Sequence, residues 1–541
     1  MKILKQRLIV LSILILIAGQ GLAQTWEYLS FIGGPNNDLD PVITTDFNGN
    51  LLVAGSFASP ALNLGSTLLT NSGNTDVFLV KYDKAGNVLW SRSASGSNYD
   101  GARSVCTDAS GNIFVSGYFR SPNISFGPIQ LTNSNAVTYN GDAFLVKCDS
   151  MGNLLWAKNL GAKKILASKC NAAGDVFVSG SDLALSGGGA FFYGKYSGAN
   201  GNYIWGNSGV YDGIGDGTAI VIEQNDDIYV AGNSLGGLDA LLPSLQTQGG
   251  FDAFLIKFSA SGNPLWGKML GGSGAEHAFS LVLNNSGELI ISGDFNSSLV
   301  DMGVDSLILP NLGSTSNFVA KFDTLGTEVW SRLIGNTYAL GGSWATCDAA
   351  DNIYVIGDYK PDSLSIPPFH LTNSSPTTNE VYIASFNTSG SIQWLKGIEG
   401  TSDDMAMNIT VDPFGNIYFA GNTWSPLMTL DSLTLNTHAT STTRDIFIIK
   451  LGSVINGLSS LQSTELLSAY PNPSTGIFHL SLPAQYFGMV CDVYDLSGQK
   501  ISSFRYEKDA IVNLSYLTSG MYFIKSTDAS LKGIKLILNK D

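Results

Sequence analysis

Acidic residues recur at one register of this sequence and are its clearest candidates for binding chemistry. Seven segments of similar pattern end in polar turns, and eight residues before that end four of the seven carry a carboxylate. The candidates are Asp38, Asp100, Glu276 and Asp404, with Asp216 beside the fourth position. If the segments converge on one axis, these like charges repel one another and suit a cation such as calcium, or a polyhydroxylated ligand. The simpler alternative is that these acids cap turns and face solvent.

No arrangement typical of a catalytic centre is found in the sequence. The four histidines are scattered, without a His-Glu-x-x-His or Cys-x-x-Cys motif. A Gly-x-Ser-x-Gly elbow and a phosphate-binding loop are also missing from the sequence. We therefore expect a protein that is not an enzyme and that has no cofactor, calcium excepted.

The cysteines give no sign of a disulfide framework. Their number is odd, and they are spread along the chain at Cys106, Cys148, Cys170, Cys347 and Cys491. Such a distribution is unlike the closely spaced pairs of small crosslinked domains. We expect most of them to be small buried hydrophobic side chains.

Composition indicates an exported all-β protein. Only 13% of the 541 residues are charged, 61 are glycine, and the formal net charge is −15, which disfavours nucleic acid as a partner. The first residues combine Lys2, Lys5 and Arg7 with an apolar stretch at 8–18 and small residues at 21–23. This pattern predicts a secretory signal over residues 1–23 and no transmembrane segment after its cleavage.

Internal repeats define the expected fold. A polar turn followed by a β-branched and aromatic strand recurs seven times, about every 60 residues, at 48–55, 110–117, 173–180, 225–232, 286–293, 350–357 and 414–421. A second strand, of the type Asp76-Val-Phe-Leu-Val-Lys-Tyr82, follows each copy, and a strand carrying Trp follows six of them. The repeated Trp could stack on sugars, but its regular recurrence favours packing between units.

The missing Trp strand is found at the beginning of the chain, at Trp26–Ile32. Four strands per unit, repeated radially, make a β-propeller, and a strand lent by the N-terminus closes its ring. The sequence therefore predicts a seven-bladed propeller over residues 24–451. These repeats resemble the bacterial seven-bladed β-propeller repeat family (SBBP), a resemblance that implies a fold and no defined activity.

A different β-rich segment follows a serine-rich linker at 452–467. We expect residues 468–541 to form a small β-sandwich. Its motifs resemble the type A C-terminal sorting domain of the type IX (Por) secretion system. The matching residues are Pro471, Asn472, Pro473, Gly476, Asp495, Gly498, Gly520, Tyr522, Lys535 and Lys540. The resemblance implies the type IX secretion machinery as a partner, passage through the periplasm, and release from the cell or attachment to its outer surface.

These observations favour a secreted or surface-attached binding protein with the propeller as its scaffold. Long connections between the second and third strands of a unit, such as 58–75, 120–141 and 361–379, are candidates for binding an extracellular glycan or protein. The alternative is a propeller-based hydrolase or lyase acting on polysaccharide or peptide. Acids converging with a His, Tyr or Arg on the central channel would favour that alternative.

Overall fold

The computed structural model divides the chain into two units, Met1–Val454 and Ile455–Asp541. The residues that it describes are 24–134, 141–183, 189–208, 214–238, 240–309, 314–335, 342–360, 363–373, 377–431, 433–440, 442–452, 468–470, 475–481, 489–495, 499–506, 511–526, 534–538 and 540. The predicted signal at 1–23 and nearly all of the predicted linker lie outside these residues.

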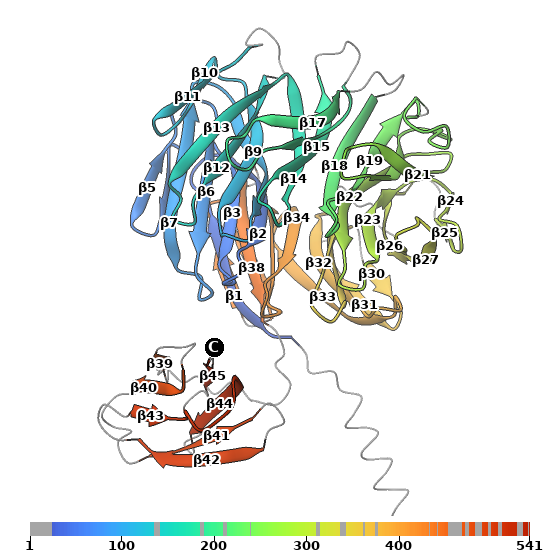
Figure 1. The fold of residues 1–541 in the computed structure, drawn as a ribbon. Coiled ribbons are helices and arrows are strands. Elements are labelled where there is room, and N and C mark those ends of the chain that lie inside the picture. Colours follow the sequence, from blue (N-terminus) through green and yellow to red (C-terminus); the bar gives the residue numbers. More distant parts are fainter. Residues whose placement is uncertain are drawn as a thin grey trace, which may run out of the picture. The chain divides into compact units, whose positions relative to one another are not determined.

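Seven sheets built on the same plan make up the first unit, and four strands of each correspond to one sequence repeat (Figure 1). The innermost strands are β2 (Asp38–Thr45), β8 (Asp100–Thr107), β14 (Lys163–Cys170), β18 (Ile214–Ile222), β22 (Glu276–Leu283), β28 (Ser343–Cys347) and β34 (Asp404–Val411). The second strands are β3 (Leu51–Phe57), β9 (Ile113–Phe119), β15 (Val176–Asp182), β19 (Ile228–Leu235), β23 (Leu289–Phe295), β29 (Ile353–Tyr359) and β35 (Ile417–Thr423).

The third and fourth strands complete each blade. The third strands are β6 (Asp76–Tyr82), β12 (Asp142–Cys148), β16 (Ala190–Tyr196), β20 (Asp252–Phe258), β26 (Ser316–Phe322), β32 (Glu380–Phe386) and β38 (Asp445–Leu451). The outer strands are β7 (Val88–Gly96), β13 (Leu154–Gly161), β17 (Tyr203–Ser208), β21 (Pro264–Leu270), β27 (Glu328–Ile334), β33 (Ile392–Gly400) and β1 (Trp26–Ile32). The second and third strands are apolar runs buried on both faces, as expected for strands between two neighbouring sheets.

The innermost strands contact one another in a ring. Each touches the next along the chain, and β34 of the last blade touches β2 of the first. The N-terminal strand β1 pairs antiparallel with β38 and becomes the outer strand of the last blade, so blue and orange strands lie side by side in Figure 1. The all-β propeller class expected from the repeats is confirmed.

One detail of β1 differs from the sequence-based expectation. In most blades a lysine of the third strand faces the Trp of the outer strand, as Lys147 faces Trp156. In the last blade Lys450 faces Tyr28 and Leu451 faces Trp26, across the same bulge that the other blades have, because the Trp of β1 comes two residues earlier. Tyr28 therefore takes the place of the repeated Trp, and Trp26 packs against Phe419 instead.

The long connections between second and third strands fold into small hairpins. These are β4 (Ala61–Leu64) with β5 (Thr67–Thr70), β10 (Asn123–Phe126) with β11 (Ile129–Thr132), β24 (Leu299–Asp301) with β25 (Ser306–Ile308), β30 (Ser363–Ile366) with β31 (Phe369–Thr372), and β36 (Leu427–Leu430) with β37 (Leu433–Asn436). Strand β10 pairs with β7 of the preceding blade, and β36 pairs with β33 in the same way. Two of the five hairpins thus join neighbouring blades, a use that the expectation of binding loops overlooked.

The second unit contains two sheets around one core. They consist of β39 (Ser468–Tyr470), β40 (Ile477–Ser481) and β43 (Ile511–Asn513), and of β41 (Val490–Tyr494), β42 (Lys500–Arg505), β44 (Gly520–Ser526) and β45 (Ile534–Leu538). Phe478 and Val512 from the first sheet pack in one cluster with Val493 and Ile524 from the second. This arrangement is a small β-sandwich with a core of its own.

Candidate functional site

A cavity of about 730 Å³ lies where the innermost strands meet. Six of these strands carry a bulge near their beginning, and in five of them the bulge leaves one residue without a partner on the second strand: Arg103, Leu166, Thr218, Phe279 and Met407. A bulge redirects the side chain of its extra residue. All five residues line the cavity, so the bulges supply its wall with side chains that the regular alternation would place elsewhere.

The same bulges account for the glycine that ends the repeated motif in six of the seven blades. Gly232 lies opposite the bulge of β18, and a Cβ atom there would clash with the carbonyl oxygen of Asp216. Gly293 meets the carbonyl oxygen of His277 in the same way. The glycine is required because the backbone of the innermost strand comes too close for any side chain.

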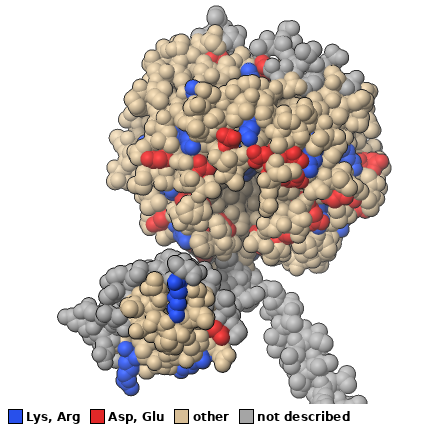
Figure 2. Space-filling model, in the orientation of Figure 1, with Lys and Arg blue, Asp and Glu red and all other residues tan. Residues whose placement is uncertain are grey.

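Charged side chains at the start of the innermost strands are paired with each other. Arg103 bridges to Asp40 of the preceding blade at 3.0 Å, and Lys164 bridges to Asp216 of the following blade at 2.8 Å. These four side chains are partly exposed and line the cavity. Of the acids singled out by the sequence, Asp216 alone is among the residues that line the cavity. Figure 2 shows acidic and basic side chains interspersed over one face of the propeller, without a large patch of one sign.

Two aromatic side chains stand on another part of the cavity wall. Phe279 of β22 and Trp344 of β28 both line it, and their ring centroids are 5.5 Å apart. His277 lies 6.0 Å from Phe279 and is hydrogen-bonded through Nδ1 to Asp294 at 2.8 Å. This hydrogen bond raises the pKa of His277. The aromatic pair was not identified from the sequence, because neither residue belongs to the repeated motif.

The other predicted acids are buried rather than exposed at a channel mouth. Asp38, Asp100 and Asp404 are 0% exposed and Glu276 is 1% exposed. Each of the three aspartates accepts a hydrogen bond from a serine hydroxyl 21 residues later, over 2.6–2.9 Å: Ser59, Ser121 and Ser425. These acids do cap turns, but they do so inside the blades. These four acids therefore form no open ring at a channel mouth, and they do not face solvent, so both expectations were wrong for them.

Burial changes the protonation of these carboxyl groups. Loss of solvent raises the pKa of Asp38 and Asp100 to about 6 and that of Asp404 to about 7, although hydrogen bonds to serine oppose the shift. Burial also raises the pKa of Glu276, which accepts a hydrogen bond from the backbone of Gly272. The spacing of 21 residues between acid and serine, repeated along the chain, is the sequence signal that could have revealed this role.

A second set of buried acids was missed. Asp76, Asp142, Asp252 and Asp445 open the third strands, and each accepts a hydrogen bond from the backbone of the preceding loop. Glu380 has the same place in its blade, where burial raises its pKa to about 8. The recurring acid before the Phe-Leu-Val-Lys pattern carried the signal.

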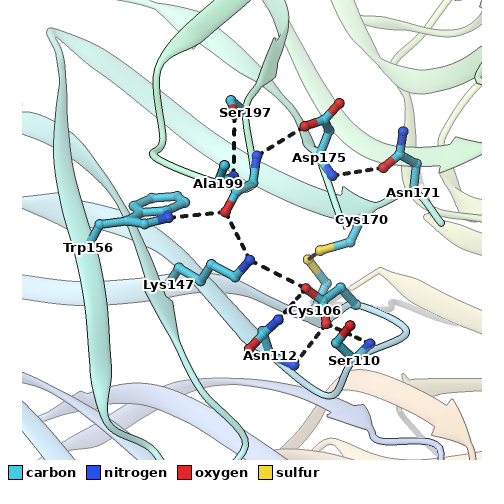
Figure 3. Close-up of polar contacts among 12 residues, drawn as sticks. Cys106, Ser110, Asn112, Lys147, Trp156, Cys170, Asn171, Asp175, Ser197 and Ala199 are labelled. Atoms are coloured by element: carbon cyan, nitrogen blue, oxygen red, sulfur yellow. Dashed lines mark hydrogen bonds and ion pairs between the residues drawn. The ribbon is translucent and has the colours of Figure 1, made fainter. Parts of the chain in front are cut away.

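Lysine and tryptophan of one blade hold the next blade. In Figure 3, Lys147 Nζ and Trp156 Nε1 both donate to the carbonyl oxygen of Gly198, at 2.9 and 3.2 Å. Lys81 and Trp90 bind the carbonyl of Ser150 in the same way. The repeated Trp side chains therefore pack between blades, as their regular recurrence predicted.

The Asp-x-x-Gly-Asn turns are closed by their own side chains. Asp83 accepts hydrogen bonds from the backbone of Ala85 and Asn87, at 2.9 and 2.8 Å, and Gly86 has a positive φ of 87°. Among the residues that the structure describes, no group of three or more His, Cys, Asp or Glu is placed to hold a metal ion. The expectation that calcium binds stays a prediction.

The sorting-motif residues are partly described. Gly476 has φ +125° and packs against Ser515, the Asp495 carboxylate accepts a hydrogen bond from the backbone of Gln499, and the hydroxyl of Tyr522 donates to the carbonyl of Thr518. Gly520, Lys535 and Lys540 are also described. The residues Pro471, Asn472, Pro473 and Gly498 lie outside the described part. Within the described part of the chain, no helix is long and apolar enough to cross a membrane.

Residues 468–539 match the family model of a secretion system C-terminal sorting domain. The C-terminal unit contains a type IX sorting domain. Residues 393–427, from β33 to the first residue of β36, match the model of a β-propeller repeat. The sorting domain indicates export and implies the type IX secretion machinery as a partner, with secretion or attachment to the outer cell surface as the result.

Other relatives are distant. An uncharacterised WD repeat-containing protein of Acanthamoeba polyphaga mimivirus is 22% identical over 428 residues, which are 71% of this chain and 29% of that protein. Thus the chain spans less than a third of this relative. Among solved structures, the Dos1 propeller has a TM-score of 0.42 at 9% identity, covering 79% of this chain and 96% of that one. A protein of unknown function from Dyadobacter fermentans has a TM-score of 0.39 at 11% identity, with 68% and 98% covered.

Proposed function

We propose that the propeller is a non-enzymatic binding module, displayed outside the cell, that takes a polyhydroxylated ligand such as the end of a glycan into its central cavity. The observation that carries this proposal is that aromatic rings and paired charged groups line the same cavity. Phe279 and Trp344 offer apolar ring surfaces, and the pairs Arg103–Asp40 and Lys164–Asp216 offer both hydrogen-bond donors and acceptors.

Sugars present apolar C–H faces and hydroxyl edges, so they fit a site that combines aromatic rings with convergent polar groups. Two acids do converge with Arg103 on this cavity, as the hydrolase or lyase alternative requires, but the pairing of their charges favours binding. Each charge is already neutralised by a partner across a blade boundary, which holds these side chains in place for hydrogen bonding. The buried acids are poorly placed to act as general acids, because their carboxylate oxygens accept hydrogen bonds from serines of turns inside the blades.

A glycan and peptide array probed with the secreted protein tests this proposal. We expect glycan hits whose affinity falls about fivefold or more in Trp344→Leu, because an aromatic contact contributes about 1 kcal/mol beyond its buried area. Lys164→Met should weaken the same hits. Tyr203→Leu is the control, since Tyr203 is an exposed aromatic residue on outer strand β17.

Hits that ignore both cavity substitutions would overturn the cavity as the site. Peptide hits that respond to them would show that the ligand is a protein. Appearance of cleaved products, lost in the cavity variants, would establish the hydrolase or lyase alternative instead.

We further propose the route of export. The signal at 1–23 directs the chain to the periplasm, the sorting domain carries it across the outer membrane, and that domain is then removed. The match over residues 468–539 and the separate core of this unit support this order of events.

A further inference from the structure

Two cysteines from neighbouring blades meet beside the central cavity. Cys106 is the penultimate residue of β8, and Cys170 is the last residue of β14. Their Sγ atoms are 2.8 Å apart, and Figure 3 shows the two side chains pointing at one another. A disulfide bond requires about 2.05 Å between the sulfurs. A movement of less than about 1 Å would therefore bring these sulfurs to bonding distance.

Ordinary apolar packing explains only part of this contact. Cys106 belongs to a buried hydrophobic cluster, and Cys170 packs against that cluster. Cys106 is buried, but Cys170 is partly exposed and lines the cavity. The hydroxyl of Ser168 lies 3.9 Å from Cys106 Sγ. Cys170 Sγ therefore lies closer to Cys106 Sγ than this hydroxyl does.

A second blade boundary offers an internal comparison. Cys347 is the last residue of β28, as Cys170 is of β14. The residue of β22 that corresponds to Cys106 is Val282, and Val282 and Cys347 belong to the same hydrophobic cluster. At that boundary a cysteine packs as a small apolar side chain, whereas between β8 and β14 both positions carry sulfur.

We propose that Cys106 and Cys170 form a disulfide bond in the exported protein and so tie the second blade covalently to the third. The bond forms outside the cytoplasm, where disulfides persist. It would close a loop of about 64 residues, which removes entropy from the unfolded chain. The other three cysteines remain free.

The oxidant is a disulfide-carrying thiol oxidoreductase. The thiolate of one cysteine attacks the oxidant's disulfide, forming a mixed disulfide and releasing one oxidant thiolate. The thiolate of the other cysteine then attacks the mixed disulfide at the sulfur of its partner, and the second oxidant thiol leaves. Two protons are lost from the cysteines, and two electrons pass to the oxidant. Cys106 is buried in the folded propeller, so the reaction belongs to folding, before the blades close around this thiol.

Alkylation of the purified secreted protein tests this inference. The protein is unfolded in denaturant with N-ethylmaleimide, with or without prior reduction, and its peptides are analysed by mass spectrometry. Without reductant we expect Cys106 and Cys170 to be unlabelled and recovered as one linked peptide, whereas Cys148 and Cys347 are labelled. Full labelling of Cys106 and Cys170 without reductant would overturn the proposal.

Variants separate the bond from mere burial. In Cys106→Ser, Cys170 should become labelled without reductant, and the melting temperature should fall by about 5 °C. Cys347→Ser is the matched control and should leave the linked peptide intact. Val282→Cys rebuilds the pair at the other boundary and should protect Cys347. Protection of Cys170 in Cys106→Ser would contradict the pairing, and the wild-type labelling result stands even if a variant folds poorly.

Discussion

At the scale of single residues, the buried carboxyl groups are the most unusual feature of the propeller. Asp38, Asp100 and Asp404 sit at the first position of their strands and are fully removed from solvent. Each receives a serine hydroxyl and holds a turn in place. Because burial penalises the ionised form, these groups link the stability of the fold to pH.

The propeller should be more stable at pH 5 than at pH 8. The pKa of Asp404 is about 7 in the folded chain and about 3.9 when unfolded. The folded state therefore binds more protons, so the free energy of unfolding is greatest at low pH and decreases as pH rises from about 4 to about 7. The free energy of unfolding is measured by urea unfolding at pH 5 and at pH 8. Asp404→Asn should reduce the difference between these two values by on the order of 2 kcal/mol.

Asp83→Asn is the control for this measurement. Hydrogen bonds from Asn87 and Ala85 hold the pKa of Asp83 below its usual value. Its contribution to stability is present above the unfolded pKa and is lost only as pH falls through the lower, folded pKa, outside the window of pH 5 to 8. Parallel pH profiles for the wild type and Asp404→Asn would contradict the assignment.

At the scale of elements, the blades are joined by devices that repeat along the chain. Lysine and tryptophan of one blade bind a turn of the next, and Lys450 of the last blade donates to the carbonyl of Lys84 in the first at 3.0 Å. Strand β1 adds the outer strand of that last blade. The boundary between last and first blades therefore keeps the lysine contact of the others, with Tyr28 in the place of the Trp.

Removing β1 should destabilise the whole propeller. Deletion of residues 24–33 leaves β38, an apolar strand buried along its length, as an unpaired edge. We expect a lower melting temperature and aggregation, measured by calorimetry and light scattering. Ile32→Ala should cost about 2–4 kcal/mol, since Ile32 is 1% exposed, and Ile32→Val only about 1 kcal/mol. An unchanged melting temperature after the deletion would refute closure by β1.

At the scale of the whole molecule, the central cavity and the sorting domain belong to separate units. The propeller holds the cavity, and the C-terminal unit has its own core and matches a sorting domain. Because the two cores are independent, either unit can be altered without unfolding the other.

Truncation after residue 452 should abolish export without affecting the fold. We expect the truncated protein to accumulate in the periplasm of its native host with the melting temperature of the propeller unchanged. A periplasmic reporter fused to residues 453–541 should in turn reach the outside of the cell. Normal amounts of the truncated protein at the cell surface, measured by protease accessibility and immunoblotting, would refute the role of the domain.

Local patterns along the chain were sufficient to predict the architecture. Seven registered copies of one motif, with a Trp strand displaced from the last copy to Trp26–Ile32, indicated a propeller whose first strand completes its last blade. The sorting motifs near the end likewise predicted the C-terminal domain. The all-β propeller class and the sorting domain were predicted correctly because strand period, turn residues and repeat spacing are local properties, which a chain displays without its tertiary contacts.

The candidate site depended on contacts that no local pattern contains. The bulges that direct Arg103 and Phe279 into the cavity arise from the close approach of two strands, which the sequence does not display. The acids that recur along the chain pointed instead to Asp38 and Asp404, which are buried. Cys106 and Cys170 are neighbours only because successive blades pack side by side. Sequence decided which strands form; the packing of blades around an axis decided which side chains meet, because that packing joins residues far apart in the chain.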